Sequence, residues 1–594
     1  MRSFIPLVLL AGTAFSSPFS LFPHKSDSKP SVTIRDGTIE GSVANGVESF
    51  NGIPFADPPI KDLRLKPPQP LSKSFGNIKS QKNAKSCPQF VVQSHTGKLP
   101  QSVASTLVNL PITQAVADYG EDCLTINVIR PENTTADAKL PVLFWIFGGG
   151  FELGSTAQYD GQQFVNQSIR LNEPVIWVAV NYRVSGFGFL AGKELAAEGS
   201  TNLGLRDQRL GLQWTADNIA KFGGDPDKVT IWGESAGAIS VYDHLIINGG
   251  DNTYKGKPLY RAAIANSGSA VPTDDVTAPQ AQKIYDQVVV EAGCDKEKDT
   301  LACLRKTSYT RLLSAINSVP SLVGYRALDL SYLPRPDPGD NFFPESPEVP
   351  GLALKWPKVP IIIGDQEDEG TLFGLFVGNN ITTNAELIQY LASYFPTNPN
   401  ATQLVTGLAD LYPNNPDGGQ PAGAPFNTGD KNNLYPQFKR LSAILGDIVF
   451  TLPRRIVLDV ANPRTDTWSY ISSVLRGTPV LGSCHGSDLL FDFGLVGKGD
   501  DFRTTSIQTY YINFINNLDP NKGAKNESLV AWPKYNSKTR PLLELGKNYT
   551  DLYPGGDHFR QAAADYLRVS MRGIRYVNSA WLTCMQDNIP QFRV

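Results

Sequence analysis

The sequence has few histidines, little sulfur and no block of like charges. It contains five histidines, six cysteines and three methionines among 594 residues, and its formal net charge is −3. Because no run of lysine and arginine stands out, nothing indicates a nucleic-acid partner or binding to an anionic membrane surface. An internal repeat and a low-complexity linker are also absent, so no boundary divides the chain into several domains.

The sequence has no apolar run long enough to span a membrane, but a short apolar run lies at the N-terminus. Residues 1–17, MRSFIPLVLLAGTAFSS, combine one arginine, an apolar stretch and small residues, which is typical of a secretory signal peptide. We expect this peptide to cover residues 1–16, with an approximate end, and residues 17–594 to form one domain. No later run reaches the ~18 apolar residues of a transmembrane helix. Secretion is supported by six glycosylation sequons, at Asn133, Asn166, Asn380, Asn400, Asn526 and Asn548.

The apolar residues that are present form strand-like runs separated by helix-like segments. Residues 141–147, 174–180 and 359–365 are apolar and strand-like, whereas 207–222 has the length and pattern of a helix. Such alternation predicts an α/β fold with a large, mostly parallel sheet covered by helices on both faces. Stretches rich in proline and glycine, such as 412–433, are expected to be long loop insertions.

Six cysteines in a secreted protein usually pair, although the sequence alone permits many pairings. Cys294 and Cys303 are close enough in the chain to close a local loop. Cys87 and Cys123 bracket a longer segment whose base they could tie together. The sequence leaves open whether the remaining two pair or stay as thiols, namely Cys484 and Cys584.

A serine between two glycines is the strongest candidate for a nucleophile. The sequence GESAG at 233–237 follows a β-branched and aromatic run at 229–232, which reads as a short strand opened by a turn in 222–228. The residues after it have the pattern of a packed helix. Ser235 would then occupy the sharp strand-to-helix turn known as a nucleophile elbow. The alternative is a glycine-rich turn without chemistry.

A serine hydroxyl needs a histidine base, and the scarcity of histidine narrows the choice. In this kind of fold the order along the chain is serine, acid, histidine, which excludes His24 and His95. His244 lies on the helix that follows the serine, with no room for an acid between them, and reads as a packed helix residue. His485, in a small-residue loop, and His558 both satisfy the order, so the order alone leaves both open.

Four carboxylates follow one predicted buried strand and are candidates for the acid that orients the histidine. They are Asp365, Glu367, Asp368 and Glu369, in a loop where parallel strands present active-site groups. A cluster of acids is more often a solvated loop. Spacing does not choose among the four.

A glycine-rich loop supplies the third part of the expected site. Residues 148–150 are three glycines after the strand-like run at 141–147. Backbone N–H groups of such a loop, together with that of Ala236 after the serine, are the usual donors to the negative oxygen of an acyl-transfer intermediate. A triple glycine after a strand is otherwise only a turn.

Taken together, these segments resemble the type-B carboxylesterase/lipase family of α/β-hydrolases, and the resemblance spans most of the chain. The stretches that carry it are 51–59, 121–128, 147–151, 181–190, 202–214, 222–237, 368–371 and 482–491. Their order and spacing are far more specific than any one of them. The resemblance implies the α/β-hydrolase fold and a secreted serine esterase.

The resemblance also assigns roles to residues of this sequence. It implies Ser235 as nucleophile, Glu369 of the DEGT segment as acid and His485 as base. It further implies oxyanion donors at Gly149, Gly150 and Ala236. The implied disulfides are Cys87–Cys123 and Cys294–Cys303. Two positions depart from the common pattern, namely Cys484 directly before the base and Phe147 where many esterases carry histidine.

The branch of secreted fungal lipases and sterol esterases is favoured by the stretches 330–337, 361–371 and 445–455. The segment 88–122 resembles the lid of that branch. Val103, Leu107 and Leu110 recur there at helical spacing, which predicts an amphipathic helix that covers an apolar cleft and turns toward a lipid surface. A fixed surface helix would show the same pattern.

The sequence therefore predicts a secreted carboxylic-ester hydrolase that acts on triacylglycerols or sterol esters through an acyl-enzyme intermediate. This chemistry needs no metal and no organic cofactor. The expected partner is a lipid or small ester, bound from solution or at a lipid–water interface, and the sequence leaves the oligomeric state open. One alternative is a carboxylesterase for short, soluble esters. Another, from a different class, is a catalytically silent adhesion protein, although such proteins generally lack an intact triad.

Overall fold

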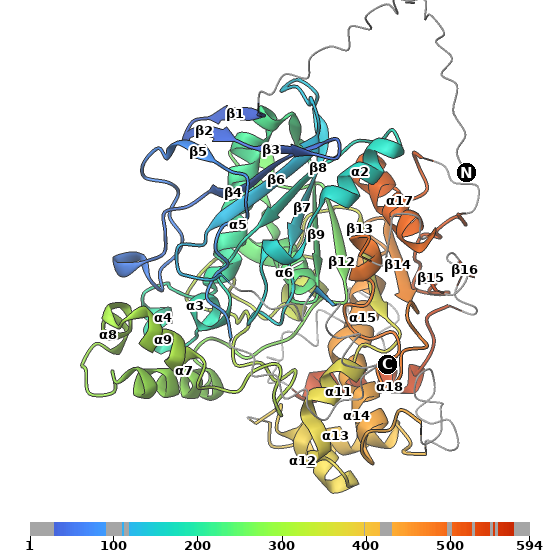
Figure 1. Cartoon of the computed structure of the whole chain (residues 1–594). Coiled ribbons are helices and arrows are strands. Elements are labelled where there is room, and N and C mark those ends of the chain that lie inside the picture. Colours follow the sequence, from blue (N-terminus) through green and yellow to red (C-terminus); the bar gives the residue numbers. More distant parts are fainter. Residues whose placement is uncertain are drawn as a thin grey trace, which may run out of the picture.

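A single large sheet organises the chain. The structure is a computed structural model, and it describes residues 29–90, 110–111, 118–396, 398–415, 431–495, 502–524, 529–546, 551–552 and 556–574. Within these residues the sheet has 11 strands (Figure 1). Their spatial order is β16 (Asp551–Leu552), β15 (Leu543–Leu545), β14 (Thr467–Ser472), β13 (Ile361–Gln366), β12 (Ala262–Asn266), β9 (Gly224–Glu234), β7 (Leu140–Ile146), β8 (Ile176–Val180), β6 (Thr125–Pro131), β4 (Val47–Pro54) and β3 (Ser42–Ala44).

The centre of this sheet is parallel. Every neighbouring pair from β15 through β14, β13, β12, β9 and β7 to β8 is parallel, and the antiparallel pairs lie at the two ends. All five residues of β8, IWVAV, are buried. Such continuous apolar strands fit a sheet that is covered on both faces. The predicted α/β-hydrolase class, with its mostly parallel sheet, is confirmed.

Helices cover both faces of the sheet. On one side lie α2 (Gln162–Arg170) and α17 (Phe502–Asn517), and on the other α5 (Leu203–Asn218) and α6 (Ala236–Ile246) (Figure 1). Smaller sheets lie outside this core, one of β1 (Ser31–Ile34), β2 (Gly37–Glu40) and β5 (Gly76–Lys79) and one of β10 (Thr253–Tyr254) and β11 (Lys257–Pro258).

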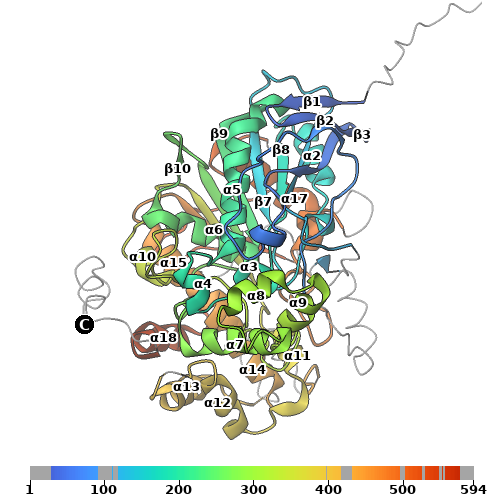
Figure 2. The same cartoon turned by 90° about the vertical axis from the view of Figure 1, so that its left-hand side faces the viewer.

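Further helices gather at one end of the sheet, as both views show (Figures 1 and 2). They are insertions between strands, and helices that pack there cover the carboxyl ends of the parallel strands, where α/β enzymes bind ligands. These helices are α7 (Pro279–Ala292), α8 (Thr300–Lys306), α9 (Tyr309–Ile316), α11 (Thr371–Val377), α12 (Asn384–Ala392), α13 (Ala401–Asp410) and α14 (Phe438–Gly446). The other α-helices within the described residues are α3 (Ser185–Phe189), α4 (Lys193–Ala197), α10 (Glu348–Leu352), α15 (Leu452–Ala461), α16 (Leu489–Asp492) and α18 (Gln561–Ile574).

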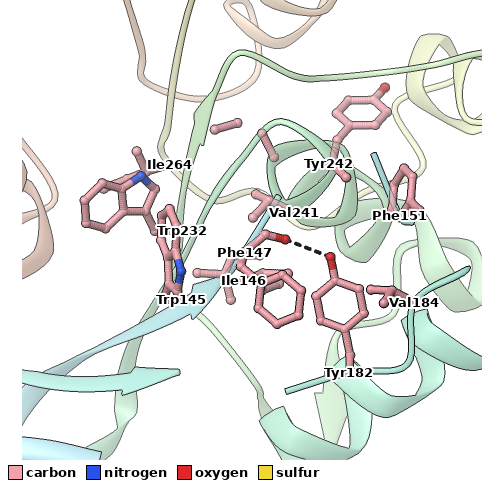
Figure 3. Packing of buried hydrophobic residues seen from close by; sticks show 14 of the residues in the cluster. Trp145, Ile146, Phe147, Phe151, Tyr182, Val184, Trp232, Val241, Tyr242 and Ile264 are labelled. Carbon is pink, nitrogen blue, oxygen red and sulfur yellow. Dashed lines mark hydrogen bonds between the residues drawn. The ribbon is translucent and has the colours of Figure 1, made fainter. Parts of the chain in front are cut away.

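Aromatic side chains from adjacent strands form the core beside the central strands. The rings of Trp145 on β7 and Trp232 on β9 meet edge to face with centroids 4.9 Å apart, and both residues are fully buried (Figure 3). Directly after β7, the ring of Phe147 stacks on that of Tyr182 with centroids 4.3 Å apart. The Tyr182 hydroxyl donates a hydrogen bond of 2.7 Å to the Phe147 carbonyl. These contacts fix the end of β7, from which the glycine-rich loop leaves.

One predicted boundary is wrong. The strand expected at 229–232 begins earlier, because β9 includes the residues that read as an opening turn. Gly224 pairs with Leu140 of β7, and a register shift separates this pair from the regular ladder that starts at Val229. The irregular ladder accommodates Pro226, which has no N–H to donate.

Two disulfides are formed, Cys87–Cys123 and Cys294–Cys303, with Cα atoms 5.0 and 5.8 Å apart. They are the two pairs that the resemblance implies. Cys484 is a buried free thiol, and burial raises its pKa far above the ordinary value. A thiol that is buried and not ionised is a poor nucleophile.

Several predictions fall outside the described residues or are not tested by them. The signal peptide, Cys584 and most of the predicted lid, including Val103 and Leu107, lie outside. Leu110 is described and is fully buried. Of the sequons, Asn133, Asn380 and Asn400 are exposed, Asn166 is partly exposed, and Asn526 and Asn548 lie outside. Among the described residues, no helix is both long and apolar enough to cross a membrane.

Candidate active site

Ser235 occupies a strained turn between β9 and α6. Its backbone has φ 56° and ψ −124°, a conformation that few residues with a side chain adopt. The turn is possible because Gly233 and Gly237 lack side chains. A Cβ at Gly233 would collide with the Gly237 carbonyl, and one at Gly237 with the carbonyl of Ile146. The sequence GESAG therefore folds as a tight elbow, and Ser235 lines a cavity beyond it.

Three side chains from distant parts of the chain form one hydrogen-bonded line at this elbow. The Ser235 hydroxyl lies 2.7 Å from Nε2 of His485, and Nδ1 of His485 lies 2.6 Å from Oε2 of Glu369. The second oxygen of Glu369 accepts a 2.6 Å hydrogen bond from the Gln366 backbone N–H. Since Glu369 is acidic and accepts from Nδ1–H, the neutral imidazole presents its lone pair to the serine.

Two loops are held side by side so that this line can form. Glu369 follows β13 and His485 precedes α16. Asp368 and Cys484 form an isolated parallel bridge between them. The Asp368 N–H donates to the Ser483 carbonyl at 3.1 Å, and the Ser483 N–H donates to the Asp368 carboxylate at 2.9 Å. Residues 368 and 483–484 therefore act as a clasp that sets Glu369 beside His485.

The other acids of the loop have different partners. Asp365 forms a buried ion pair of 2.6 Å with Arg454, and Glu367 pairs with Arg476 at 2.7 Å. Asp368 belongs to the clasp. Of the four carboxylates that spacing left open, only Glu369 contacts the imidazole.

The other described histidines lie elsewhere. His244 is buried on α6 and bonds to Gln208 at 3.1 Å, and burial lowers its pKa to about 3, so that it stays neutral. His558 is exposed. His24 and His95 fall outside the described residues. Among the described histidines, His485 alone therefore reaches the serine.

A second carboxyl group, which the sequence did not single out, faces the imidazole. Glu234, directly before the serine, has an oxygen 3.4 Å from Nε2 of His485. Both residues are fully buried, and no hydrogen-bond partner is found for either oxygen of Glu234 among the described protein atoms. Burial raises the pKa of Glu234 to about 8 despite the attraction of the imidazolium.

The environment of His485 favours its charged form. Burial alone would lower its pKa, but the attraction and hydrogen bond of Glu369, with a contribution from Glu234, outweigh burial and raise the pKa to about 9. The rings of Phe450 and Phe373 pack against the imidazole, with centroids 4.7 and 5.0 Å away. These rings restrict its rotation and exclude water.

The glycine-rich loop lies against the serine. Gly149 and Gly150 have φ 113° and 61°, and a Cβ at Gly148 would approach the Ser235 Cβ to 2.8 Å. Gly150 and Ala236 line the same cavity as Ser235. Ala236 is the first residue of α6, so its N–H is one of the helix donors without an intrahelical acceptor. Within the described residues, no group of three or more histidine, cysteine or acidic side chains has the arrangement to hold a metal ion.

Comparison with known proteins agrees with this geometry. The profile of the carboxylesterase family matches residues 28–563. The chain belongs to the carboxylesterase family. It is 50% identical to "Secreted lipase 1" of Botryotinia fuckeliana, over 95% of this chain and 98% of that protein. It is 48% identical to "Secreted triacylglycerol lipase LIP1" of Gibberella zeae, over 93% and 92% of the two chains.

Among solved structures, this chain is similar to EstA of Aspergillus niger. The TM-score is 0.76 at 26% identity, with 92% of this chain and 100% of that chain covered. Family membership and these relatives identify the protein as a carboxylic-ester hydrolase.

Two cavities with largely apolar walls share part of their lining, and Ser235 lines the first of them. The first, about 60 Å³, is lined by Ser235 and by apolar side chains such as Leu330 and Phe450. The second, about 180 Å³, shares six lining residues with the first and continues between α12, α13 and α15. The shared residues are Val271, Thr273, Leu328, Leu330, Leu333 and Val449. The residues that line these cavities come from several separate insertions, so no sequence pattern predicts that they lie together.

Proposed function

We propose that this protein is a secreted hydrolase of lipid esters, triacylglycerols or sterol esters, that works through an acyl-enzyme intermediate. The observation that carries the proposal is the hydrogen-bonded line from Ser235 through His485 to Glu369, which ends at an apolar cavity. An alcohol, an imidazole and a carboxylate in this order are what nucleophilic acyl transfer requires.

In the proposed reaction, His485 takes the proton of the Ser235 hydroxyl as its oxygen attacks the ester carbonyl carbon. The carbonyl oxygen becomes negative and accepts hydrogen bonds from the N–H groups of Gly149, Gly150 and Ala236. His485 then gives its proton to the departing alcohol, which leaves an acyl group on the serine. Water, deprotonated by the same imidazole, releases the acid, while Glu369 stabilises the imidazolium in both halves.

The lipid substrate is supported by the surroundings of the serine. Of the residues lining the first cavity, most are leucine, valine, isoleucine, phenylalanine or proline, which suits a hydrocarbon chain better than a polar acyl group. The two relatives reported above are named as secreted lipases, and exposed sequons such as Asn133 and Asn400 fit a secreted glycoprotein. We extend the proposal to the segment 88–122 as a lid tied by Cys87–Cys123.

A panel of substrates tests this proposal. We expect the full-length enzyme to hydrolyse emulsified triolein or cholesteryl oleate at least as fast as soluble glyceryl triacetate at equal ester concentration. The rate on glyceryl tributyrate is expected to rise where the substrate passes its solubility limit, because a lid opens at the interface. Hydrolysis confined to soluble esters would instead identify a carboxylesterase for short esters. No hydrolysis of any ester would favour a silent binding protein.

The pKa of His485 predicts the pH dependence of the reaction. Because that pKa is raised to about 9, the imidazole is protonated below this pH and cannot take the serine proton. We expect kcat/KM for glyceryl triacetate, followed by titration of the released acid, to rise about tenfold per pH unit and to level off only near pH 9. Circular dichroism over the same range serves as the control for folding. A plateau that starts near pH 6 to 7, where an ordinary imidazole titrates, would contradict this prediction.

A further inference from the structure

A carboxyl group is buried in the wall of the apolar cavity that opens at the serine. Ser235, Ile239 and Asp243 all line this cavity. They are spaced four residues apart from the start of α6, so they lie one above another on one face of the helix. The face that begins at the nucleophile therefore ends, two turns later, at an acid.

Asp243 has no partner that would explain its place among apolar side chains. It is 0% exposed, and neither of its oxygens forms a hydrogen bond with the described protein atoms. Besides Asp243 and the serine, Thr273 is the remaining polar side chain of this cavity wall, and its hydroxyl donates to the Pro334 carbonyl at 3.2 Å. A buried polar group without a partner is costly and calls for a functional explanation.

The chemistry of this carboxyl group indicates what it can bind. Burial, with no ion pair to offset it, raises the pKa of Asp243 far above its ordinary value and so favours the protonated carboxyl group. A protonated carboxyl group offers one O–H donor and a carbonyl acceptor. Among the groups that an ester substrate carries, a hydroxyl is the smallest that matches both. An unsubstituted hydrocarbon chain matches neither.

The distance from the serine fits the middle of a long acyl chain. Asp243 lies eight positions after Ser235, which directly precedes α6, and this spacing corresponds to a helical rise of about 12 Å. An extended chain advances roughly 1.2 Å per bond, as the span of a peptide backbone shows. A group bound by Asp243 would therefore sit about ten carbons from the ester carbonyl. The second cavity, which shares six lining residues with the first, has room for the rest of the chain.

We propose that Asp243 determines acyl specificity by binding a hydroxyl group in the middle of the acyl chain, so that hydroxy fatty acyl esters are preferred substrates. The proposal rests on the acyl-enzyme function argued above. The acyl part is the one concerned, because it stays on the serine after the alcohol has left. Its hydroxyl donates to the Asp243 carbonyl oxygen and accepts from the Asp243 O–H.

The test compares two substrates on each enzyme variant. The substrates are p-nitrophenyl octadecanoate and p-nitrophenyl 10-hydroxyoctadecanoate, dispersed in the same detergent. The quantity measured is the ratio of the two kcat/KM values, which does not depend on how much of each preparation is folded. We expect wild type to prefer the hydroxy ester by about tenfold, which corresponds to about 1.4 kcal/mol.

Three variants locate the preference. Asp243→Leu is expected to bring the ratio to one or below, whereas Asp243→Asn, which keeps a donor and an acceptor, is expected to retain most of it. Asp217→Asn serves as the matched control, because Asp217 is 40% exposed and pairs with Lys255 at the surface. Moving the hydroxyl to carbon 3 is expected to abolish the preference in wild type.

Two outcomes would overturn the proposal. They are a wild-type ratio of one, and a ratio above one that survives in Asp243→Leu. Neither outcome affects the proposed function, which the substrate panel and the Ser235→Ala variant test separately. Suppose that Ser235→Ala hydrolyses neither ester and that wild type shows a ratio of one. The proposed esterase function would then stand, and only the proposed role of Asp243 in specificity would be wrong.

Discussion

Replacing Ser235 with alanine is expected to lower kcat on p-nitrophenyl butyrate by a factor on the order of 10⁶, as for other enzymes in which the nucleophile of a triad is removed. The reason is geometric. The hydroxyl lies 2.7 Å from the base and lines the cavity, and among the described residues no other serine and no cysteine lines that cavity. The residual rate, on the order of 10³ over water, would come from the oxyanion donors and from binding.

Two controls make this result specific. Ser168→Ala removes another buried serine hydroxyl, one that bonds to the Val165 carbonyl within α2 and lies outside the cavity walls. This variant is expected to keep kcat within a few-fold of wild type. The thermal unfolding midpoint of Ser235→Ala is expected to match wild type, since alanine fits the same space. A rate near that of wild type in Ser235→Ala would mean that another residue carries the chemistry.

Replacing Glu369 with glutamine is expected to lower kcat by about 10⁴, the loss seen when the acid of a triad becomes an amide. Glu369 is 2% exposed and accepts from both Nδ1–H of His485 and the Gln366 N–H. An amide has only one oxygen to accept, and its NH₂ group can turn the imidazole to the wrong tautomer. The imidazolium formed in the reaction also loses its negative partner.

Glu367→Gln is the matched control for this prediction. Glu367 lies two residues away in the same loop, but it pairs with Arg476, whose side chain is 44% exposed. We expect this control to change kcat less than about threefold, because Glu367 does not contact the imidazole and its ion pair with Arg476 is partly exposed. Equal losses in the two variants would show that the loop as a whole, and not the contact to the imidazole, is needed.

The sequence predicted the fold well because parallel strands leave a strong pattern. The run at 141–147 coincides closely with β7, and 359–365 with β13, since strands buried on both faces must be apolar throughout. The prediction failed at the start of β9, where Gly224 and Pro226 read as a turn. The pairing of Gly224 with Leu140 across a register shift depends on the neighbouring strand.

The sequence predicted only part of the candidate site. The strained elbow has a local signature, so Ser235 was evident. His485 and His558 were equivalent by chain order, and the four acids after β13 were equivalent by spacing. The family resemblance chose between them, and in the structure the choice has a physical basis in the clasp between Asp368 and residues 483–484.

Glu234 and Asp243 were not found from the sequence. Their significance comes from burial without hydrogen-bond partners, which is a property of the surrounding elements. Asp243 shares a helix face with Ser235, but that face is visible only once the insertions that complete the cavity, such as 322–334, are in place.

The most direct test of the account is covalent labelling of the wild-type enzyme with a fluorophosphonate, followed by peptide mass spectrometry. We expect one adduct per chain, located on Ser235, with loss of ester hydrolysis in proportion to labelling. We also expect no adduct at this peptide in Ser235→Ala and much slower labelling in Glu369→Gln. Complete inhibition with the adduct on a different residue would contradict the central claim.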